Sequence, residues 1–187
     1  MNWDRLAEEY LAVTEQVFGS LRQAVDAAAD EIAARLGQGN KVMSCGNGGS
    51  AADAQHFACE MVNRFLKERK PYPAVALSTD TSVISSIAND YSYELVFEKQ
   101  VRALGKPGDV LIGISTSGMA ENVCRAVKAA RDMNILSIGL TGGKGGKLLS
   151  LADRSICISC TASTPRIQEG HRLVIHALCE RIEELLM

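Results

Sequence analysis

An imidazole and a carboxylate, His56 and Glu60, lie four residues apart in a segment with helical patterning. Side chains at this spacing share one face of a helix, so the two can bind one divalent metal ion or serve as general acid and base. A solvated ion pair on a helix surface is the alternative interpretation. Two further histidines, His171 and His176, follow Gln168 in the last helical segment. Their angular offsets from Gln168 around that helix are similar in size, so spacing alone does not choose between them.

Two short loops combine glycine with hydroxyl or amide side chains. They read Gly46-Asn47-Gly48-Gly49-Ser50 and Ser115-Thr116-Ser117-Gly118, and each lies between an apolar run and a helical segment. A helix N-terminus presents free N–H groups and the positive end of its dipole, and therefore binds anions. Three hydroxyls within one turn match the three oxygens of a phosphate monoester. The alternative for the second loop is a plain strand-to-helix turn with capping hydroxyls. The pair of loops favours a phosphorylated small-molecule ligand.

A nucleotide ligand is a weaker interpretation of the same glycines. Residues 46–51 match the G-x-G-x-x-A form of the dinucleotide fingerprint, but no acidic residue ends the next strand, and Asp80 comes about thirty residues later. The glycine-rich stretch 142–147 lacks the Ser or Thr of a phosphate-binding P-loop. Asn89-Asp90 is a turn by itself, and beside a sugar pocket it would contact hydroxyl groups.

Short apolar runs that alternate with helical patterns must position these residues. Runs apolar on both faces predict an α/β fold, with a parallel sheet sandwiched by helices. Ligands of such sheets bind beyond the carboxyl ends of the strands, where both loops fall. Residues 3–36 predict a long N-terminal helix, with Gly19-Ser20 as a candidate break, and its apolar stripe needs a partner. The expected strands are 41–45, 74–78, 109–115, 135–141 and 154–159, and the later helices are 50–65, 80–88, 94–104, 120–133, 147–151 and 165–186.

Length and composition exclude several classes of protein. The 187 residues suit one domain, and a net charge of −2 gives no basic field to recruit nucleic acid or an anionic membrane. We find no leader pattern and no apolar run approaching about 18 residues, so a cytoplasmic location and no membrane partner are expected. Six cysteines fit reduced, mostly buried thiols. Cys157 and Cys160 have C-x-x-C spacing, but a strand would point them to opposite faces, and no second pair completes a zinc site.

Six segments, at 45–50, 56–60, 88–90, 108–118, 166–171 and 175–176, together resemble one known family. That family is the phosphoheptose isomerases of the sugar-isomerase (SIS) superfamily, and the resemblance runs from the N-terminal helix to the C-terminus in one order. It implies a single flavodoxin-like SIS domain over residues 1–187, in which residues 1–37 form a helical arm for oligomer contacts. It also implies a homotetramer with active sites at subunit interfaces.

The resemblance further implies conversion of sedoheptulose 7-phosphate into D-glycero-D-manno-heptose 7-phosphate through an enediol. This reaction is the entry step to nucleotide-activated heptose for lipopolysaccharide core and other bacterial surface glycans. Glu60 would be the base for the carbon proton, and His176 the acid that moves the oxygen proton. One zinc ion per subunit would be bound by His56, Glu60, Gln168 and His176. Substrate contacts would fall on Asn47, Gly48, Gly49, Ser50, Glu60, Arg64, Asn89, Asp90, Ser115, Thr116, Ser117 and Gln168.

The sequence departs from the family pattern at three positions. Met119 and Ala120 stand where the family commonly has Asn and a phosphate-binding Ser, and Pro165 replaces an acidic residue that reaches the substrate in some members. Two other functions are alternatives to the isomerisation of a heptose phosphate. One is a non-catalytic adaptor of the same superfamily that binds the bacterial replication initiator, but members of that branch generally lack the Glu60 and His176 equivalents. The other is an isomerase for a different phosphosugar.

Overall fold

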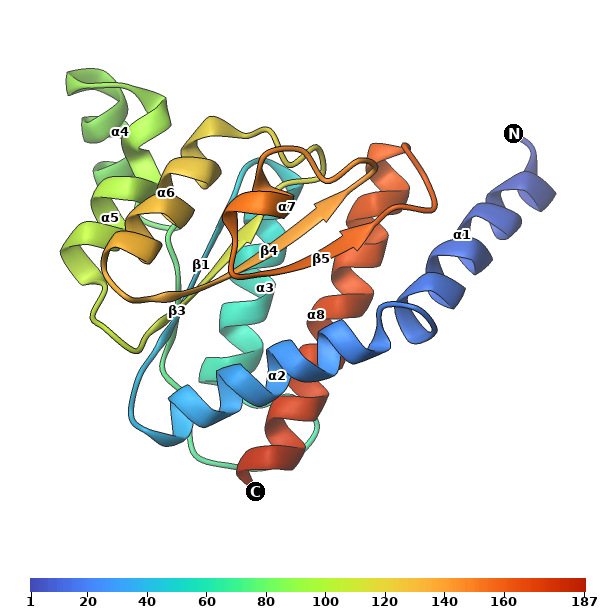
Figure 1. The fold of residues 1–187 in the computed structure, drawn as a ribbon, viewed down its shortest axis with the longest axis horizontal. Coiled ribbons are helices and arrows are strands. Elements are labelled where there is room, and N and C mark those ends of the chain that lie inside the picture. The colour runs from blue at the N-terminus through green and yellow to red at the C-terminus, as the bar shows by residue number, and fades with distance from the viewer.

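The computed structural model describes residues 1–187 as a five-stranded parallel sheet with helices on both faces (Figure 1). The strand order is β2-β1-β3-β4-β5, which is the flavodoxin-like order of doubly wound sheets. The strands are β1 (Val42–Gly46), β2 (Ala74–Ala76), β3 (Val110–Ile114), β4 (Leu136–Gly142) and β5 (Arg154–Ile158). The helices are α1 (Trp3–Phe18), α2 (Arg22–Gly37), α3 (Gly49–Val62), α4 (Thr81–Asp90), the 3₁₀ helix η1 (Tyr93–Leu95), α5 (Val96–Leu104), α6 (Glu121–Asp132), α7 (Leu148–Leu151) and α8 (Thr164–Leu186).

Alternate side chains of the central strands fill two separate cores. In β3, Val110, Ile112 and Ile114 face the larger core, which includes buried residues of α2, α3 and α8, whereas Leu111 faces the core beneath α5, α6 and α7. Every residue of β1, β3 and β4 is buried. This burial is expected of parallel strands covered on both faces, and the predicted sandwich is confirmed.

The N-terminal segment forms two helices rather than one. Gly19 ends α1, and its N–H donates to the carbonyl of Glu15 at 2.9 Å. A Cβ at Gly19 would lie 2.6 Å from that carbonyl oxygen, so the conformation suits glycine alone. The predicted break at Gly19-Ser20 is therefore confirmed. α2 then packs on α8, while α1 buries Val13 and Val17 in the larger core and its N-terminal part extends away from the body of the protein (Figure 1).

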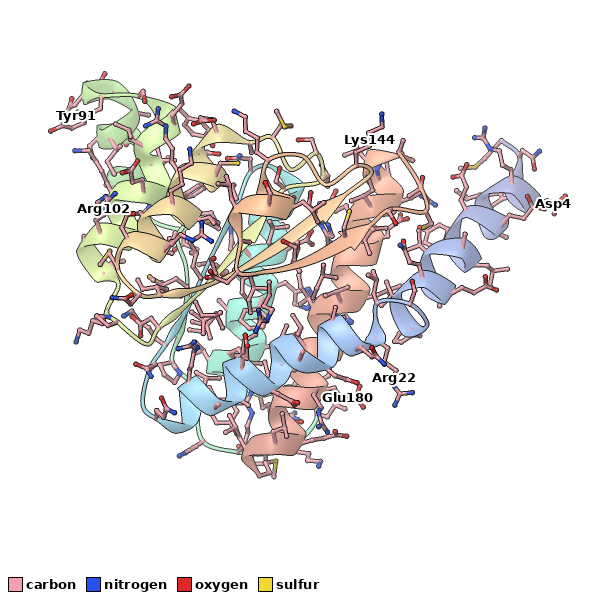
Figure 2. All side chains as sticks on the ribbon, viewed as in Figure 1. Asp4, Arg22, Tyr91, Arg102, Lys144 and Glu180 are labelled. Atoms are coloured by element: carbon pink, nitrogen blue, oxygen red, sulfur yellow. The ribbon has the colours of Figure 1, made fainter.

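The exposed face of α1 carries large apolar side chains. Trp3, Leu11 and Phe18 are 69%, 62% and 57% exposed. α1 is at one end of the molecule, and Tyr91, which follows α4, is at the other; Figure 2 labels Tyr91 and also Asp4 near the start of α1. α4 buries none of its residues fully. Both ends of the molecule therefore present surface that the fold of one subunit does not cover.

Pairing of β1 with β3 brings the two loops together. The strands run parallel, and Gly46 is in register with Ile114. Asn47 and Ser115 therefore leave neighbouring strands at the same level of the carboxyl edge. Strand order reverses at this point, because β2 lies on one side of β1 and β3 on the other. Ligands of doubly wound sheets bind in the crevice at such a switch point.

Several predicted boundaries need correction. The segment 94–104 begins as η1 before it continues as α5, and α6 starts at Glu121. Asn89-Asp90 is the last turn of α4 rather than a separate turn. The expectation of mostly buried thiols is wrong for half of them, because only Cys45, Cys124 and Cys179 are buried; all six cysteines are free. No helix is long and apolar enough to serve as a transmembrane span.

Candidate active site

The first loop joins β1 directly to α3. Gly48 occupies the N-cap position with φ of +54°, a left-handed conformation that glycine adopts without strain. The N–H groups of Gly48 and Gly49 donate to no acceptor within the chain. Ser50 is buried in the first turn of the helix, where its N–H donates to the carbonyl of Asn47 at 3.0 Å. The loop thus offers free donors at a helix N-terminus, as anion binding requires.

The second loop is a tight turn after β3. The N–H of Gly118 donates to the carbonyl of Ser115 at 3.0 Å, and Gly118 has φ of +64°. The N–H groups of Thr116 and Ser117 donate to no acceptor in the chain. Helix α6 begins at Glu121, one residue later than predicted, and no side chain caps its N-terminus. The free N–H groups of this turn, rather than a helix dipole, are its means of binding an anion.

Asn122 and Tyr93 both form hydrogen bonds to Asn47 in the first loop. Asn122 lies in the first turn of α6 and exchanges two hydrogen bonds of 2.8 Å with Asn47, one in each direction between the side-chain amides. The hydroxyl of Tyr93 donates to the same Asn47 carbonyl oxygen at 3.0 Å. These bonds fix the Asn47 side chain between the ends of two strands.

A second group of polar side chains forms between α3 and α8. The Nε2 atom of His56 lies 3.0 Å from Oε1 of Glu60 and 3.4 Å from Nε2 of His176. The two imidazole rings meet edge to face, with centroids 5.0 Å apart. All three side chains are partly buried. The structure therefore places His176, and not His171, beside the His56–Glu60 pair.

The environment of His176 favours its neutral form. Burial lowers the pKa of His176, and the neighbouring His56 and Arg172 lower it further, against the opposing effect of Glu60. A neutral imidazole has one N–H donor and one free lone pair. It can therefore donate a proton to one oxygen and accept from another, or bind a metal through the lone pair.

Gln168 lies against the first loop rather than beside His56. Its Nε2 donates to Oδ2 of Asp53 at 3.5 Å, and Arg172 donates to the other carboxylate oxygen at 3.3 Å. A Cβ atom on Gly49 would collide with the side-chain amide of Gln168. Gln168 can therefore pack against the first loop because glycine at position 49 has no side chain. Asp53 itself is fully buried.

The chemistry of this donor set fits a zinc ion. Zinc accepts imidazole nitrogen and carboxylate oxygen, and ligands about 2.0–2.1 Å from a tetrahedral ion lie about 3.3 Å from one another. The distances of 3.0 and 3.4 Å around His56 are close to that value. His56, Glu60 and His176 as placed do not form a group of three side chains that could hold a metal ion, and the amide nitrogen of the fourth expected ligand, Gln168, is bonded to Asp53.

Comparison with known proteins shows which family this chain resembles. A family model described as the SIS domain matches residues 6–142. The chain is 49% identical to the phosphoheptose isomerase of Maridesulfovibrio salexigens over 94% of this chain and 85% of that protein. It is 56% identical to the phosphoheptose isomerase of Thiobacillus denitrificans over 81% of this chain and 78% of that protein.

Solved structures give the same result. The phosphoheptose isomerase of Neisseria gonorrhoeae is 44% identical and superposes with a TM-score of 0.88 over 97% of this chain and 98% of that chain. The phosphoheptose isomerase of Francisella tularensis is 37% identical, with a TM-score of 0.92 over 97% and 96% of the two chains. This chain belongs to the phosphoheptose isomerase family. The predicted SIS fold is therefore confirmed.

Three residues that the family resemblance assigns to the substrate stand apart from both groups. Arg64 is exposed after α3 and pairs with Glu68 at 3.7 Å. Asn89 and Asp90 are exposed at the end of α4, and their side chains bond to each other at 2.8 Å. In a single subunit, these three side chains face outward and contact neither the loop after β1 nor the loop after β3.

Sequence reasoning missed four residues that organise the site: Asp53, Tyr93, Asn122 and Arg172. Two of them left a detectable signal. Asp53 precedes His56 by three residues and interrupts a run of alanines, so a charged side chain on the buried face of the helix could have been noticed. Asn122 lies just beyond the hydroxyl loop. The contact of Tyr93 with Asn47 depends on tertiary packing and has no local pattern.

His171 has a structural role and supplies a testable pH dependence. It is fully buried; its Nε2 donates to the carbonyl of Thr141 at 2.9 Å, and Nδ1 has no partner. Burial lowers its pKa below the ordinary value, although Thr141 and Asp53 oppose the shift. In the unfolded chain His171 therefore takes up a proton near pH 6.5, whereas in the folded chain it stays neutral to lower pH. Stability should fall as the pH drops below about 6.5, by at most about 1.4 kcal/mol per pH unit for this proton.

The variant His171→Gln keeps a donor for Thr141 but cannot titrate. Urea unfolding at pH 7.5 and 5.5 should show a smaller loss of unfolding free energy on acidification for the variant than for the wild type. Equal losses in the two proteins would contradict a neutral, buried His171.

Proposed function

We propose that this chain catalyses the interconversion of sedoheptulose 7-phosphate and D-glycero-D-manno-heptose 7-phosphate. The observation that carries the proposal is the convergence of His56, Glu60 and His176 in a member of the phosphoheptose isomerase family. The two loops with free N–H donors supply a binding site for a phosphate group. A base, an acid and an anion site are what isomerisation of a sugar phosphate needs.

Glu60 and His176 divide the proton transfers. A ketose becomes an aldose when a proton leaves C1, an enediol forms, and a proton returns at C2 while another moves between the two oxygens. Glu60 is the base for the carbon proton, and neutral His176 moves the oxygen proton. Because Oε1 of Glu60 faces His56 at 3.0 Å, we assign the carbon proton to Oε2.

The proposal includes one zinc ion per subunit, held by His56, Glu60, Gln168 and His176. Bound there, zinc would polarise the carbonyl or enediolate oxygen of the substrate. Gln168 would join this set through its carbonyl oxygen, since its amide nitrogen donates to Asp53. The buried Asp53 carboxylate thereby orients the fourth ligand.

The proposal also includes a homotetramer with active sites at subunit interfaces. Exposed apolar residues on α1, including Trp3 and Leu11, support a partner for this helix. The outward-facing Arg64, Asn89 and Asp90 would then reach the substrate bound to a neighbouring subunit. We further propose a cytoplasmic location, in keeping with six free cysteines. The product would supply nucleotide-activated heptose for lipopolysaccharide core and other bacterial surface glycans.

The decisive test is proton NMR of the purified protein incubated with sedoheptulose 7-phosphate. An anomeric signal of the heptose aldose should grow in the wild type and be absent in Glu60→Gln and His176→Asn, because general acid–base groups contribute about 10²- to 10⁴-fold to rate. Both variants should keep the oligomeric state of the wild type.

Other outcomes of this test would overturn the proposal in different ways. A fully active Glu60→Gln variant would remove Glu60 as the base. Turnover of pentose or hexose phosphates in preference to the heptose would assign a different phosphosugar. Absence of turnover with and without zinc would favour a non-catalytic adaptor.

Ser117→Ala tests the phosphate loop. Ser117 is exposed, and its hydroxyl, which already accepts from the N–H of Met119 at 3.2 Å, has a proton to donate. Loss of one charge-assisted bond should raise KM about tenfold and leave kcat nearly unchanged. Steady-state kinetics measures both constants. A large fall in kcat with unchanged KM would contradict a phosphate-binding role.

Leu11→Asp tests the role of α1 as an oligomer contact. A buried charge without a partner is costly, so the variant should dissociate from the mass of four 20.1 kDa chains toward smaller species. Light scattering coupled to size-exclusion chromatography gives that mass. Leu149→Asp makes the same change at an exposed leucine on α7 and should keep the assembly. An unchanged mass for Leu11→Asp would contradict the proposed contact.

A further inference from the structure

A buried ion pair links the segment after α3 to the last turn of α8. Nε of Arg69 lies 3.2 Å from Oε1 of Glu183, and each side chain is only 2% exposed. Neither residue belongs to the group of His56, Glu60 and His176 or to the two loops. A buried ion pair is weak evidence for stability, because desolvation of the charges offsets their attraction. The contacts that the pair makes therefore indicate its role better than the pair itself.

Glu183 holds the backbone of residues 65–67. Its two oxygens accept hydrogen bonds from the N–H groups of Phe65, Leu66 and Lys67 at 3.3, 3.0 and 2.9 Å. Burial acts to raise the pKa of Glu183, but these three donors and Arg69 outweigh it and hold the pKa below its ordinary value. The carboxylate is therefore ionised and fully bonded at neutral pH, and it fixes a segment that has no regular secondary structure.

Arg69 holds the last turn of α3. Its guanidinium donates to the carbonyl of Glu60 at 2.6 Å and to that of Met61 at 2.9 Å. It also stacks on the ring of Tyr72, 4.1 Å from the centroid. Carbonyls in the last turn of a helix have no donor within the helix, and a cation there interacts favourably with the dipole. The backbone of Glu60, the proposed base, is thereby tied directly to the ion pair.

Phe65 extends the same arrangement to the proposed acid. Its N–H is held by Glu183, and its ring lies against the ring of His176, with centroids 5.7 Å apart and planes inclined by 41°. His176 precedes Glu183 by seven residues on α8, which is about two helical turns and places both side chains on one face. Glu183 thus sets the position of a ring that packs on His176.

We infer that Arg69 and Glu183 are positioning residues for the isomerase reaction, acting on Glu60 through its carbonyl and on His176 through Phe65. The inference rests on the proposed function. One ion pair thereby sets the separation of the base and the acid, although neither of its members touches the substrate. Misplacement of a catalytic group by about 1 Å can cost about 100-fold in rate, so loss of this support should lower kcat.

The first experiment compares Phe65→Leu with Phe65→Tyr. Leucine removes the ring that packs on His176, and kcat should fall about 10- to 100-fold while KM changes by less than about twofold. Tyrosine keeps the ring and should restore kcat to within about twofold of the wild type. A role confined to folding would lower the yield of active enzyme or the stability and would not give this split between kcat and KM.

The second experiment compares Glu183→Gln with Glu180→Gln. The two substitutions are chemically identical and fall one turn apart on α8, but Glu180, labelled in Figure 2, is exposed. Glu183→Gln should lower kcat by a factor similar to that of Phe65→Leu, and Glu180→Gln should leave it unchanged. The double variant of Phe65→Leu with Glu183→Gln should lose less than the product of the single losses, because both act through the same contact. If Glu183→Gln fails to fold, the two Phe65 variants decide the outcome.

Two results would overturn the inference. A Phe65→Leu enzyme with wild-type kcat, measured beside an active wild type, would remove the positioning role and leave the proposed function intact. Equal effects of Glu180→Gln and Glu183→Gln on kcat would do the same. Absence of turnover in the wild type would instead overturn the proposed function and, with it, the positioning inference.

Discussion

The parallel pairing of β1 with β3 is the constraint on which the rest of the structure depends. It brings Gly46 level with Ile114, so the loops that follow both strands leave the sheet side by side. A slip of one residue would point the alternating strand side chains into the wrong core. The same register fixes Asn47 within reach of Asn122. The position of the two loops is therefore set by the packing of the core beneath them.

The seam between α3 and α8 carries polar groups that a purely stabilising interface would not need. Asp53 is fully buried beside Arg172 and Gln168, and the Arg69–Glu183 pair is buried further along the same seam. Well-packed apolar side chains can replace buried ion pairs at little cost in stability. Each of these carboxylates instead bonds to a residue next to the proposed chemistry. These buried polar groups between α3 and α8 stabilise the fold less than apolar side chains would, but they position His56, Glu60 and His176.

Sequence patterns predicted the sheet and its helices because parallel strands are apolar on both faces and helices repeat every 3.6 residues. They also predicted both loops, since glycine and hydroxyl residues are needed locally. The choice of His176 over His171 could not come from spacing, because it depends on how α8 lies against α3. The contacts of Asp53, Phe65 and Glu183 join residues more than a hundred positions apart in two cases, and no local signal encodes such distances. The break in the N-terminal helical segment was predicted from Gly19, and the start of α6 was predicted to within one residue.

The placement of α8 has a consequence for the order in which the protein becomes competent during synthesis. All five strands and both loops precede α8 in the chain, but the larger core on one face of the sheet also contains buried residues of α8, so this core is completed only after α8 has been translated. The segment 63–70 must wait for the same helix, since its backbone donors find their acceptor only on α8. The last segment to be synthesised therefore completes both the larger core and the group of His56, Glu60 and His176.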